Sequence, residues 1–106
     1  MYKQADGTYV VNTTSLCSNV KGFKGATPVE VYIKNNKVIK VEALPNREGP
    51  KFYDKVKQGL FPKFNGMKLS KAAKAESLDG VTGATYTSRA VKENIAAAVA
   101  YYKKNK

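Results

Sequence analysis

The spacing of apolar positions along this chain changes from two residues to three or four, and the change separates predicted strands from predicted helices. Apolar and polar side chains alternate through residues 29–34, as in a strand with one buried face. The alternation returns over residues 39–43, where we expect Ile39 to point toward the buried side. Between these segments, Asn35 and Asn36 tolerate the left-handed backbone that a tight turn requires. The pattern therefore predicts an antiparallel hairpin.

The strongest helical pattern of the chain follows Arg89. Val91, Ile95, Val99 and Tyr102 are separated by steps of four, four and three residues, so they fall on one stripe of a helix. Because one face of the hairpin must be buried, we expect this C-terminal helix to cover it.

Three shorter segments complete the predicted fold. Residues 8–16 have the composition of a strand, residues 51–58 form two helical turns that start at Pro50, and residues 67–77 are expected to form a short strand. A chain of 106 residues builds one core, so we expect residues 1–106 to form a single domain. The sequence thus predicts an α+β fold. In it, a small antiparallel sheet is covered by a long C-terminal helix, with a short middle helix between them in the chain.

Composition adds a strong positive charge to this picture. The chain has 19 Lys and Arg residues and 8 Asp and Glu residues, which gives a net charge of +11. That excess favours an acidic partner, which could be nucleic acid, anionic lipid or an anionic cofactor. The basic residues are scattered apart from a short cluster at 103–106, so a solvated surface accounts for most of them.

The cysteine and histidine content excludes two kinds of site. Cys17 is the single cysteine, so no disulfide can form within the chain, and no histidine is present to complete a Cys/His zinc site. We expect no metal, and we expect Cys17 to be a buried apolar residue. No segment is long and apolar enough to span a bilayer.

Candidate chemistry is concentrated in residues 79–88, Asp-Gly-Val-Thr-Gly-Ala-Thr-Tyr-Thr-Ser. The segment supplies one carboxylate, two glycines and four aliphatic hydroxyls just before the predicted helix. The first amides of a helix are unpaired and carry the positive end of its dipole, and glycine allows a close approach, so the segment suits a phosphate. Alternatively, one hydroxyl at 85, 87 or 88 is a helix N-cap and the glycines only shape the turn. A nucleotide-hydrolysing P-loop is not indicated, because no Gly-Lys-Ser/Thr follows the glycines.

Residues 79–85, followed by residues 87–91, resemble the signature of the FMN-binding domain family, and weaker likeness extends over roughly residues 20 to 103. That family includes domains of the Rnf electron-transport complex and of the sodium-pumping NADH:quinone oxidoreductase. In it, the last threonine of the Ser/Thr-Gly-Ala-Thr motif is esterified to the phosphate of FMN by a separate flavin transferase. The resemblance therefore implies FMN as the cofactor, Thr85 as its covalent attachment point and a flavin transferase as a partner.

The resemblance also implies a set of residues around the cofactor. Asp79 is a turn residue that caps local amides, a part of what the transferase recognises, or both. Three hydroxyls of the motif are expected to contact phosphate oxygens: Thr82, Thr87 and Ser88. Gly83 and Ala84 are expected to leave the approach to the phosphate open. On the ring side, Glu48 lies in a loop that resembles the family's Glu-Thr-Pro loop, although Gly49 replaces the threonine. Phe52, four residues after Glu48, is the preferred aromatic contact for the ring. The other aromatic candidates are Tyr53, Phe61, Phe64 and Tyr86.

These features together predict an electron-transfer flavodomain rather than an autonomous enzyme, since no acid–base pair and no catalytic residue can be identified in the sequence. The resemblance implies redox partner proteins at a membrane. It also implies an extracytoplasmic location, with membrane association through a segment outside this sequence.

Two other classes of function stay open at this point. A small basic nucleic-acid-binding module fits the charge, although the aromatic and basic pattern of an RNA-recognition sheet is missing. A ligand-binding or lipid-binding module without flavin would use the motif as a helix cap alone. Flavin colour and fluorescence would exclude this last class.

Overall fold

The structure is a computed structural model that describes residues 1–17, 25–46, 50–75 and 85–106, apart from the side chains of residues 50–52 and 85. Within these residues, four strands form one antiparallel sheet in the order β1-β2-β3-β4. The elements are β1 (Tyr2–Lys3), β2 (Tyr9–Asn12), β3 (Val29–Lys34), β4 (Lys37–Ala43), α1 (Pro50–Gly59), the 3-10 helix η1 (Phe61–Phe64), α2 (Leu69–Ala72) and α3 (Thr85–Asn105).

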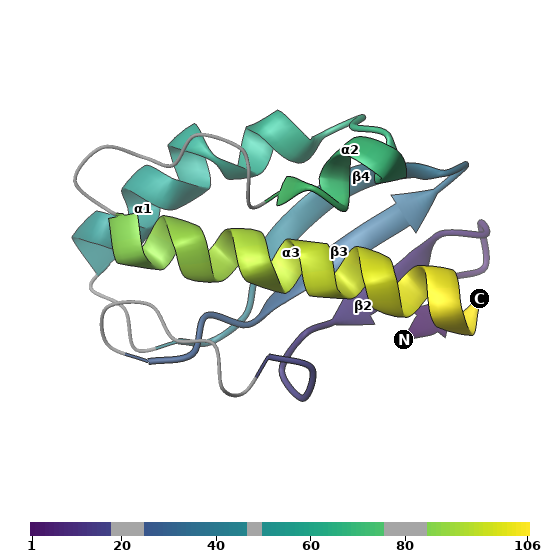
Figure 1. The fold of residues 1–106 in the computed structure, drawn as a ribbon, viewed down its shortest axis with the longest axis horizontal. Coiled ribbons are helices and arrows are strands. Elements are labelled where there is room, and N and C mark those ends of the chain that lie inside the picture. Colours follow the sequence, from purple (N-terminus) through teal and green to yellow (C-terminus); the bar gives the residue numbers. More distant parts are fainter. Residues whose placement is uncertain (18–24, 47–49, 76–84) are drawn as a thin grey trace.

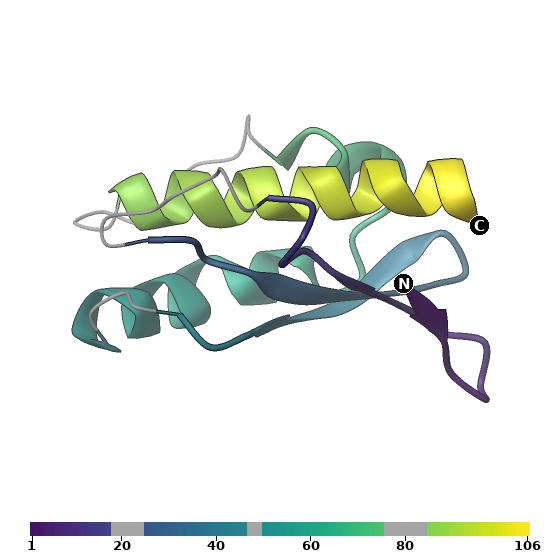
Figure 2. The ribbon, with the colours of Figure 1, turned by 90° about the horizontal axis from the view of Figure 1, so that it is seen from below.

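The arrangement of the layers confirms the predicted α+β class. The long helix α3 runs across one face of the sheet, and α1, η1 and α2 lie on its β4 side (Figures 1 and 2). The predicted middle helix is α1, which starts at Pro50 as expected. Both chain ends lie where α3 finishes, and α3 starts at the opposite end of the molecule.

The β3–β4 hairpin has the predicted turn but a different register. Asn35 and Asn36 have φ values of 53° and 64°, the left-handed backbone expected of a tight hairpin turn. A β-bulge shifts the pairing, so that Ile33 pairs with Val38 while the preceding tyrosine pairs with Lys40. Ile39 is the extra residue. The prediction for Ile39 is therefore wrong: it is 45% exposed, and Val38 takes the buried position.

Strand β2 is shorter than residues 8–16 predicted. It ends at Asn12, whose side-chain Oδ1 accepts a hydrogen bond from the Thr14 amide at 2.9 Å. An asparagine that bonds an amide two residues ahead forms a local turn in competition with the strand ladder. The turn at Asn12 therefore ends the strand, although the apolar and β-branched residues that favour a strand continue beyond it.

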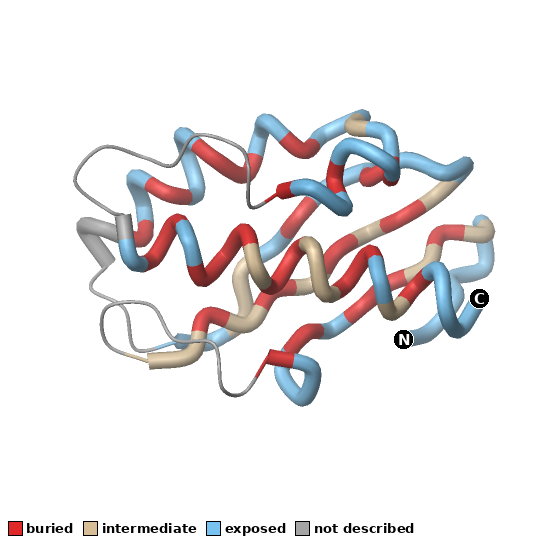
Figure 3. The backbone as a smooth tube through the Cα atoms, viewed as in Figure 1, coloured by how far each residue is buried: buried red, intermediate tan, exposed pale blue. Residues whose placement is uncertain are grey.

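The core lies between α3 and the inner face of the sheet. The predicted stripe of α3 is buried, as are alternate residues of β3, which confirms both periodicities (Figure 3). α3 also begins earlier than the stripe predicts, at Thr85. Residues from η1 and α2 close the β4 side of this core, and Phe64 and Leu69 are almost fully buried there.

The expectation of a short strand in residues 67–77 is wrong for residues 67–75, and residues 76 and 77 lie outside the described residues. Lys68 alone pairs with the sheet, in an isolated bridge to Lys37, and helix α2 follows at once. Leu69 and Ala72 are three residues apart, so a helical turn buries both against the core, whereas a strand would place them on opposite faces. Burial of this pair explains the helix.

The outer face of the sheet contains a tyrosine with an unusual titration. The Tyr32 hydroxyl lies 3.5 Å from a carboxylate oxygen of Glu30 and 3.4 Å from one of Glu42. Partial burial, followed by the negative charges of these two carboxylates, raises the pKa of Tyr32 to about 12, above its ordinary value of 10.0.

This raised pKa predicts a specific alkaline loss of stability. The folded state binds the Tyr32 proton more tightly than the unfolded state, so its stabilising contribution is complete below pH 10. It is lost as the pH rises from about 10 to about 12. Urea midpoints measured at pH 9 and pH 11.5 should therefore fall more steeply for the wild type than for Tyr32→Phe. Equal slopes for the two proteins would contradict the shift.

Candidate functional site

The fold brings the starts of two helices to one end of the molecule. α3 begins at Thr85 and α1 begins at Pro50, and both starting turns lie at the same end (Figures 1 and 2). The two helices also contact one another. Thr85 and Phe52, which are far apart in sequence, therefore share this end, as the first residue of α3 and the third of α1.

The structure covers only part of the predicted site. Five of its residues lie outside the described residues: Glu48, Asp79, Thr82, Gly83 and Ala84. The backbones of Phe52 and Thr85 are described in their helices, but their side chains are not. The roles predicted for these residues stay predictions. Thr87 and Ser88 are fully described.

Thr87 and Ser88 lie inside the first turns of α3 and face the protein. They are 2% and 1% exposed. An N-cap residue stands just before the first helical residue, whereas both hydroxyls come after Thr85. Neither Thr87 nor Ser88 is therefore the N-cap of α3, and a capping role does not account for them.

The start of α3 has a positive electrostatic character. Its first turn contains no acidic residue, so nothing there neutralises the positive end of the helix dipole. Arg89 is exposed, with its guanidinium carbon 5.7 Å from the centre of the Tyr86 ring. Lys92 is buried, only 9% exposed, and positions 85, 88 and 92 lie on one side of the helix. An anion at this helix start would meet amide dipoles, and Arg89 and Lys92 follow within the first two turns of the helix.

The other aromatic candidates divide into core and surface. Tyr53, Phe61 and Phe64 are buried, and the first two form an edge-to-face pair with ring centres 6.1 Å apart. Their rings belong to the hydrophobic core. Tyr86 is instead 58% exposed beside the start of α3.

A buried hydroxyl just before β3 also fits a polar ligand. Thr27 precedes β3 by two residues and is fully buried, and its Oγ1 has no hydrogen-bond partner among the described residues. A buried polar atom without a partner is uncommon, because it loses its bonds to water without replacement. Separately, the amides and hydroxyls at the acid-free first turn of α3 fit a phosphate-bearing cofactor.

Sequence reasoning missed a buried polar pair that fixes α3 against the sheet. Thr13 Oγ1 accepts a hydrogen bond from the Val29 amide at 2.9 Å and donates one to Asn94 Oδ1 at 2.5 Å. The Asn94 side-chain amide then donates to the Ala90 carbonyl at 2.8 Å. The sequence signal that could have indicated this pair was a polar residue, Asn94, within the apolar pattern of α3. The pair sets how α3 lies on the sheet, and with it the position of the first turn.

Substitution of Thr13 and of Asn94 should each lower the free energy of unfolding, and the two losses should depend on one another. Thr13→Val leaves both the Val29 amide and Asn94 Oδ1 without their partner, so the free energy of unfolding should fall by about 2–3 kcal/mol. Urea unfolding of Thr13→Val, Asn94→Leu and the double variant measures the coupling, expected at about 1–2 kcal/mol. Additive effects within about 0.3 kcal/mol would show that the two side chains act independently.

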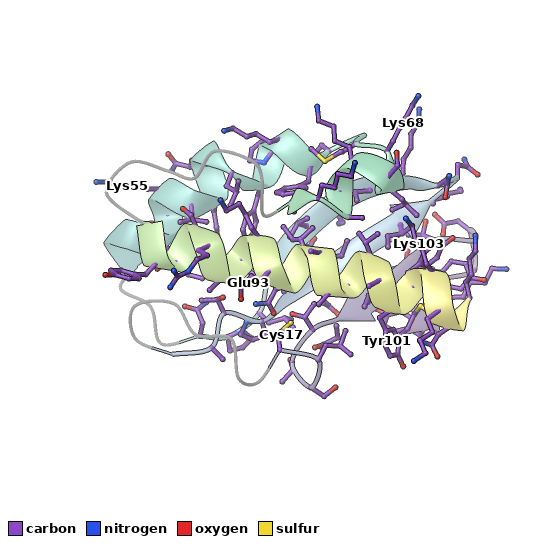
Figure 4. The ribbon with its side chains drawn as sticks, viewed as in Figure 1. Cys17, Lys55, Lys68, Glu93, Tyr101 and Lys103 are labelled. Atoms are coloured by element: carbon purple, nitrogen blue, oxygen red, sulfur yellow. The ribbon has the colours of Figure 1, made fainter. Side chains whose placement is uncertain are left out.

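Cys17 is buried, as expected, on the β2 side of α3. Burial, followed by the negative charge of Glu93, raises the pKa of the Cys17 thiol (Figure 4). The thiol is therefore protonated at neutral pH and poorly reactive. Within the described part of the chain, no three His, Cys, Asp or Glu residues group together as a metal site, and no helix could cross a membrane.

Comparison with known proteins agrees with the motif. No protein among the curated sequences matches this chain. The model of the FMN-binding domain family matches residues 22–100, which includes the β3–β4 hairpin, α1 and most of α3. Because the match covers most of the 106 residues, the chain belongs to the FMN-binding domain family, and FMN is its cofactor.

Proposed function

We propose that this protein is an electron carrier whose FMN is held by a phosphoester bond to Thr85, formed by a separate flavin transferase. The observation that carries the proposal is the place of Thr85: it is the first residue of α3, at an acid-free helix start followed by Arg89 and Lys92. A phosphate esterified at this residue would lie against unpaired amides and the positive end of the helix dipole.

FMN supplies the redox chemistry when it is bound, and the protein holds and orients it. In this proposal, the amides of the first turn of α3 donate to phosphate oxygens. Arg89 and Lys92 offset the phosphate charge, and Ser88 lies between them and Thr85 on the helix. The start of α1, which carries Phe52, provides the apolar surface for the ring.

A separate transferase is part of the proposal because the chain contains no histidine that could activate Thr85 as a base. A threonine hydroxyl is a poor nucleophile without a base or a metal. The chain contains no histidine, and the described residues contain no candidate metal site. In this proposal, the transferase supplies the base or the metal.

The family membership supports three further parts of the proposal. A covalent cofactor suits a carrier outside the cytoplasm, where lost FMN could not easily be replaced. We therefore propose an extracytoplasmic location, association with a membrane, and exchange of electrons with redox proteins at that membrane.

Intact mass tests the central claim. The protein, expressed with a flavin transferase in an export-competent host, should gain the mass of FMN less one water. The product should also remain fluorescent after denaturing electrophoresis. An unchanged mass in that host would overturn covalent attachment. A yellow protein that loses its flavin on denaturation would instead indicate non-covalent binding.

A further inference from the structure

The end of the molecule opposite the start of α3 is strongly basic. We call this end the basic pole. It gathers lysines from β1, from the β3–β4 hairpin, from the start of α2 and from the end of α3: Lys3, Lys34, Lys37, Lys68, Lys103, Lys104 and Lys106. All are exposed except Lys34, which is half-exposed. Figure 4 shows Lys68 and Lys103 at this end and Lys55 at the other.

Backbone and side-chain contacts join these elements into one surface. Lys37 and Lys68 face each other in a β-bridge. On the other side, the Tyr9 and Tyr102 rings meet edge to face with centres 5.2 Å apart, which joins β2 to the last turns of α3. The ammonium of Lys3 lies 5.5 Å from the centre of the Tyr9 ring, and the ammonium of Lys106 lies 5.3 Å from the centre of the Tyr102 ring.

Acidic side chains hardly offset this charge. Of the described carboxylates, Asp6 lies at the basic pole, 3.9 Å from the Lys34 ammonium. The others lie on the outer sheet face toward the starting end of β3, on α1, or in the first half of α3: Glu30, Glu42, Asp54 and Glu93. The basic pole therefore has seven lysines and one aspartate among the described residues, an excess of six positive charges.

We propose that the basic pole docks on an anionic membrane surface. Lysines near such a surface are attracted by its negative potential, and their long stems let the charge reach the headgroups. Tyr2, which is 55% exposed beside Lys3, and the half-exposed Tyr101 add the amphipathic rings that favour the headgroup level. The combination of lysine and tyrosine at one end matches the chemistry of a bilayer interface.

The composition and shape of the basic pole favour a membrane over nucleic acid. The pole contains lysine and no arginine, whereas arginine is the preferred cationic side chain in nucleic-acid recognition because of its planar fork of donors. The lysines come from several elements at one end of a body that measures 36 × 23 × 21 Å, so they cap its long axis. No helix presents them along one side for insertion into a groove.

This docking would fix the orientation of the protein. α3 has 21 residues, so its start lies about 30 Å from its end along the axis. A membrane at the basic pole would leave the start of α3 facing away from the lipid. The docking itself does not depend on the presence of FMN.

Vesicle flotation with matched variants tests the proposal. The full chain is mixed with phosphatidylcholine vesicles that contain 30% phosphatidylglycerol, or with phosphatidylcholine alone. It should bind only the anionic vesicles, and 0.5 M salt should release it. In Lys68→Gln/Lys103→Gln/Lys104→Gln, affinity at low salt should fall about 100-fold.

The control removes the same charge elsewhere, in Lys55→Gln/Lys57→Gln/Lys63→Gln on α1 and η1. Its affinity should fall less than about fivefold, because these lysines lie away from the basic pole. An equal loss in both variants would overturn the proposal, since overall charge alone would then explain binding. Failure of the wild type to bind, or tighter binding to a short DNA duplex at matched phosphate concentration, would also overturn it. Thermal unfolding of each variant verifies that it is folded.

Discussion

Thr85→Ala should abolish the covalent gain in mass that we expect after co-expression with a flavin transferase. The substitution removes the proposed attachment oxygen from the first residue of α3. Alanine is a good helix residue, so the fold and the helix start should persist. Intact mass spectrometry should therefore change from nearly complete modification to none, and fluorescence on a denaturing gel should disappear.

Two control variants make this result specific to Thr85. Thr85→Ser keeps a hydroxyl at the same position and should retain part of the modification. Thr14→Ala removes an exposed threonine next to β2 and should leave the modification complete. Persistence of the full mass gain in Thr85→Ala would place the ester on another hydroxyl and refute our assignment.

Phe64→Ala should cause the largest loss of stability. Phe64 is fully buried and is the largest fully buried side chain in the described part of the chain. It ends η1, which packs between α1 and β4, so its removal would leave a cavity between three elements. Phe to Ala substitutions in cores cost about 3–5 kcal/mol. That is a large fraction of the roughly 5–15 kcal/mol that stabilises a typical domain.

Urea unfolding followed by circular dichroism would measure this loss. Tyr86→Ala is the matched control, because it also truncates an aromatic ring, here one that is 58% exposed. Its free energy of unfolding should change by no more than about 0.5 kcal/mol. A loss below about 1 kcal/mol for Phe64→Ala would show that the core around η1 collapses to fill the space.

Local patterns predicted the elements whose residues all follow one period. The stripe of α3 was correct, because steps of three and four place apolar residues on one side of a helix whatever lies opposite. The Asn35-Asn36 turn was correct because the left-handed backbone depends on the residues themselves. The prediction of α1 was correct because the fixed backbone angle of Pro50 favours a helix start.

Two predictions failed where pairing or packing between elements decided the outcome, whereas the prediction for β2 failed because a local turn at Asn12 ends the strand. Ile39 fits an alternating strand, but the bulge opposite Tyr32 and Ile33 turns it outward. The short α2 forms in place of a strand because Leu69 and Ala72 gain burial against the core. Such packing partners are not adjacent in the chain, so local spacing cannot indicate them.

The candidate site shows the same division. The sequence alone indicated the motif around Thr85, its fit to a phosphate and the resemblance that the family match confirms. These follow from residue types at close spacing, which the chain carries directly. The sequence could not indicate that Asn94 bonds Thr13 across 81 positions, or that Lys92 is buried.

By itself, then, the sequence determined the family, the cofactor, the hairpin turn and the helix that follows the motif. These depend on side chains within a few residues of one another. Only the tertiary structure decided the register of the hairpin, the meeting of the α1 and α3 starts at one end, and the collection of lysines at the other. These depend on how separate segments pack, and packing selects among conformations that each segment alone could adopt equally well.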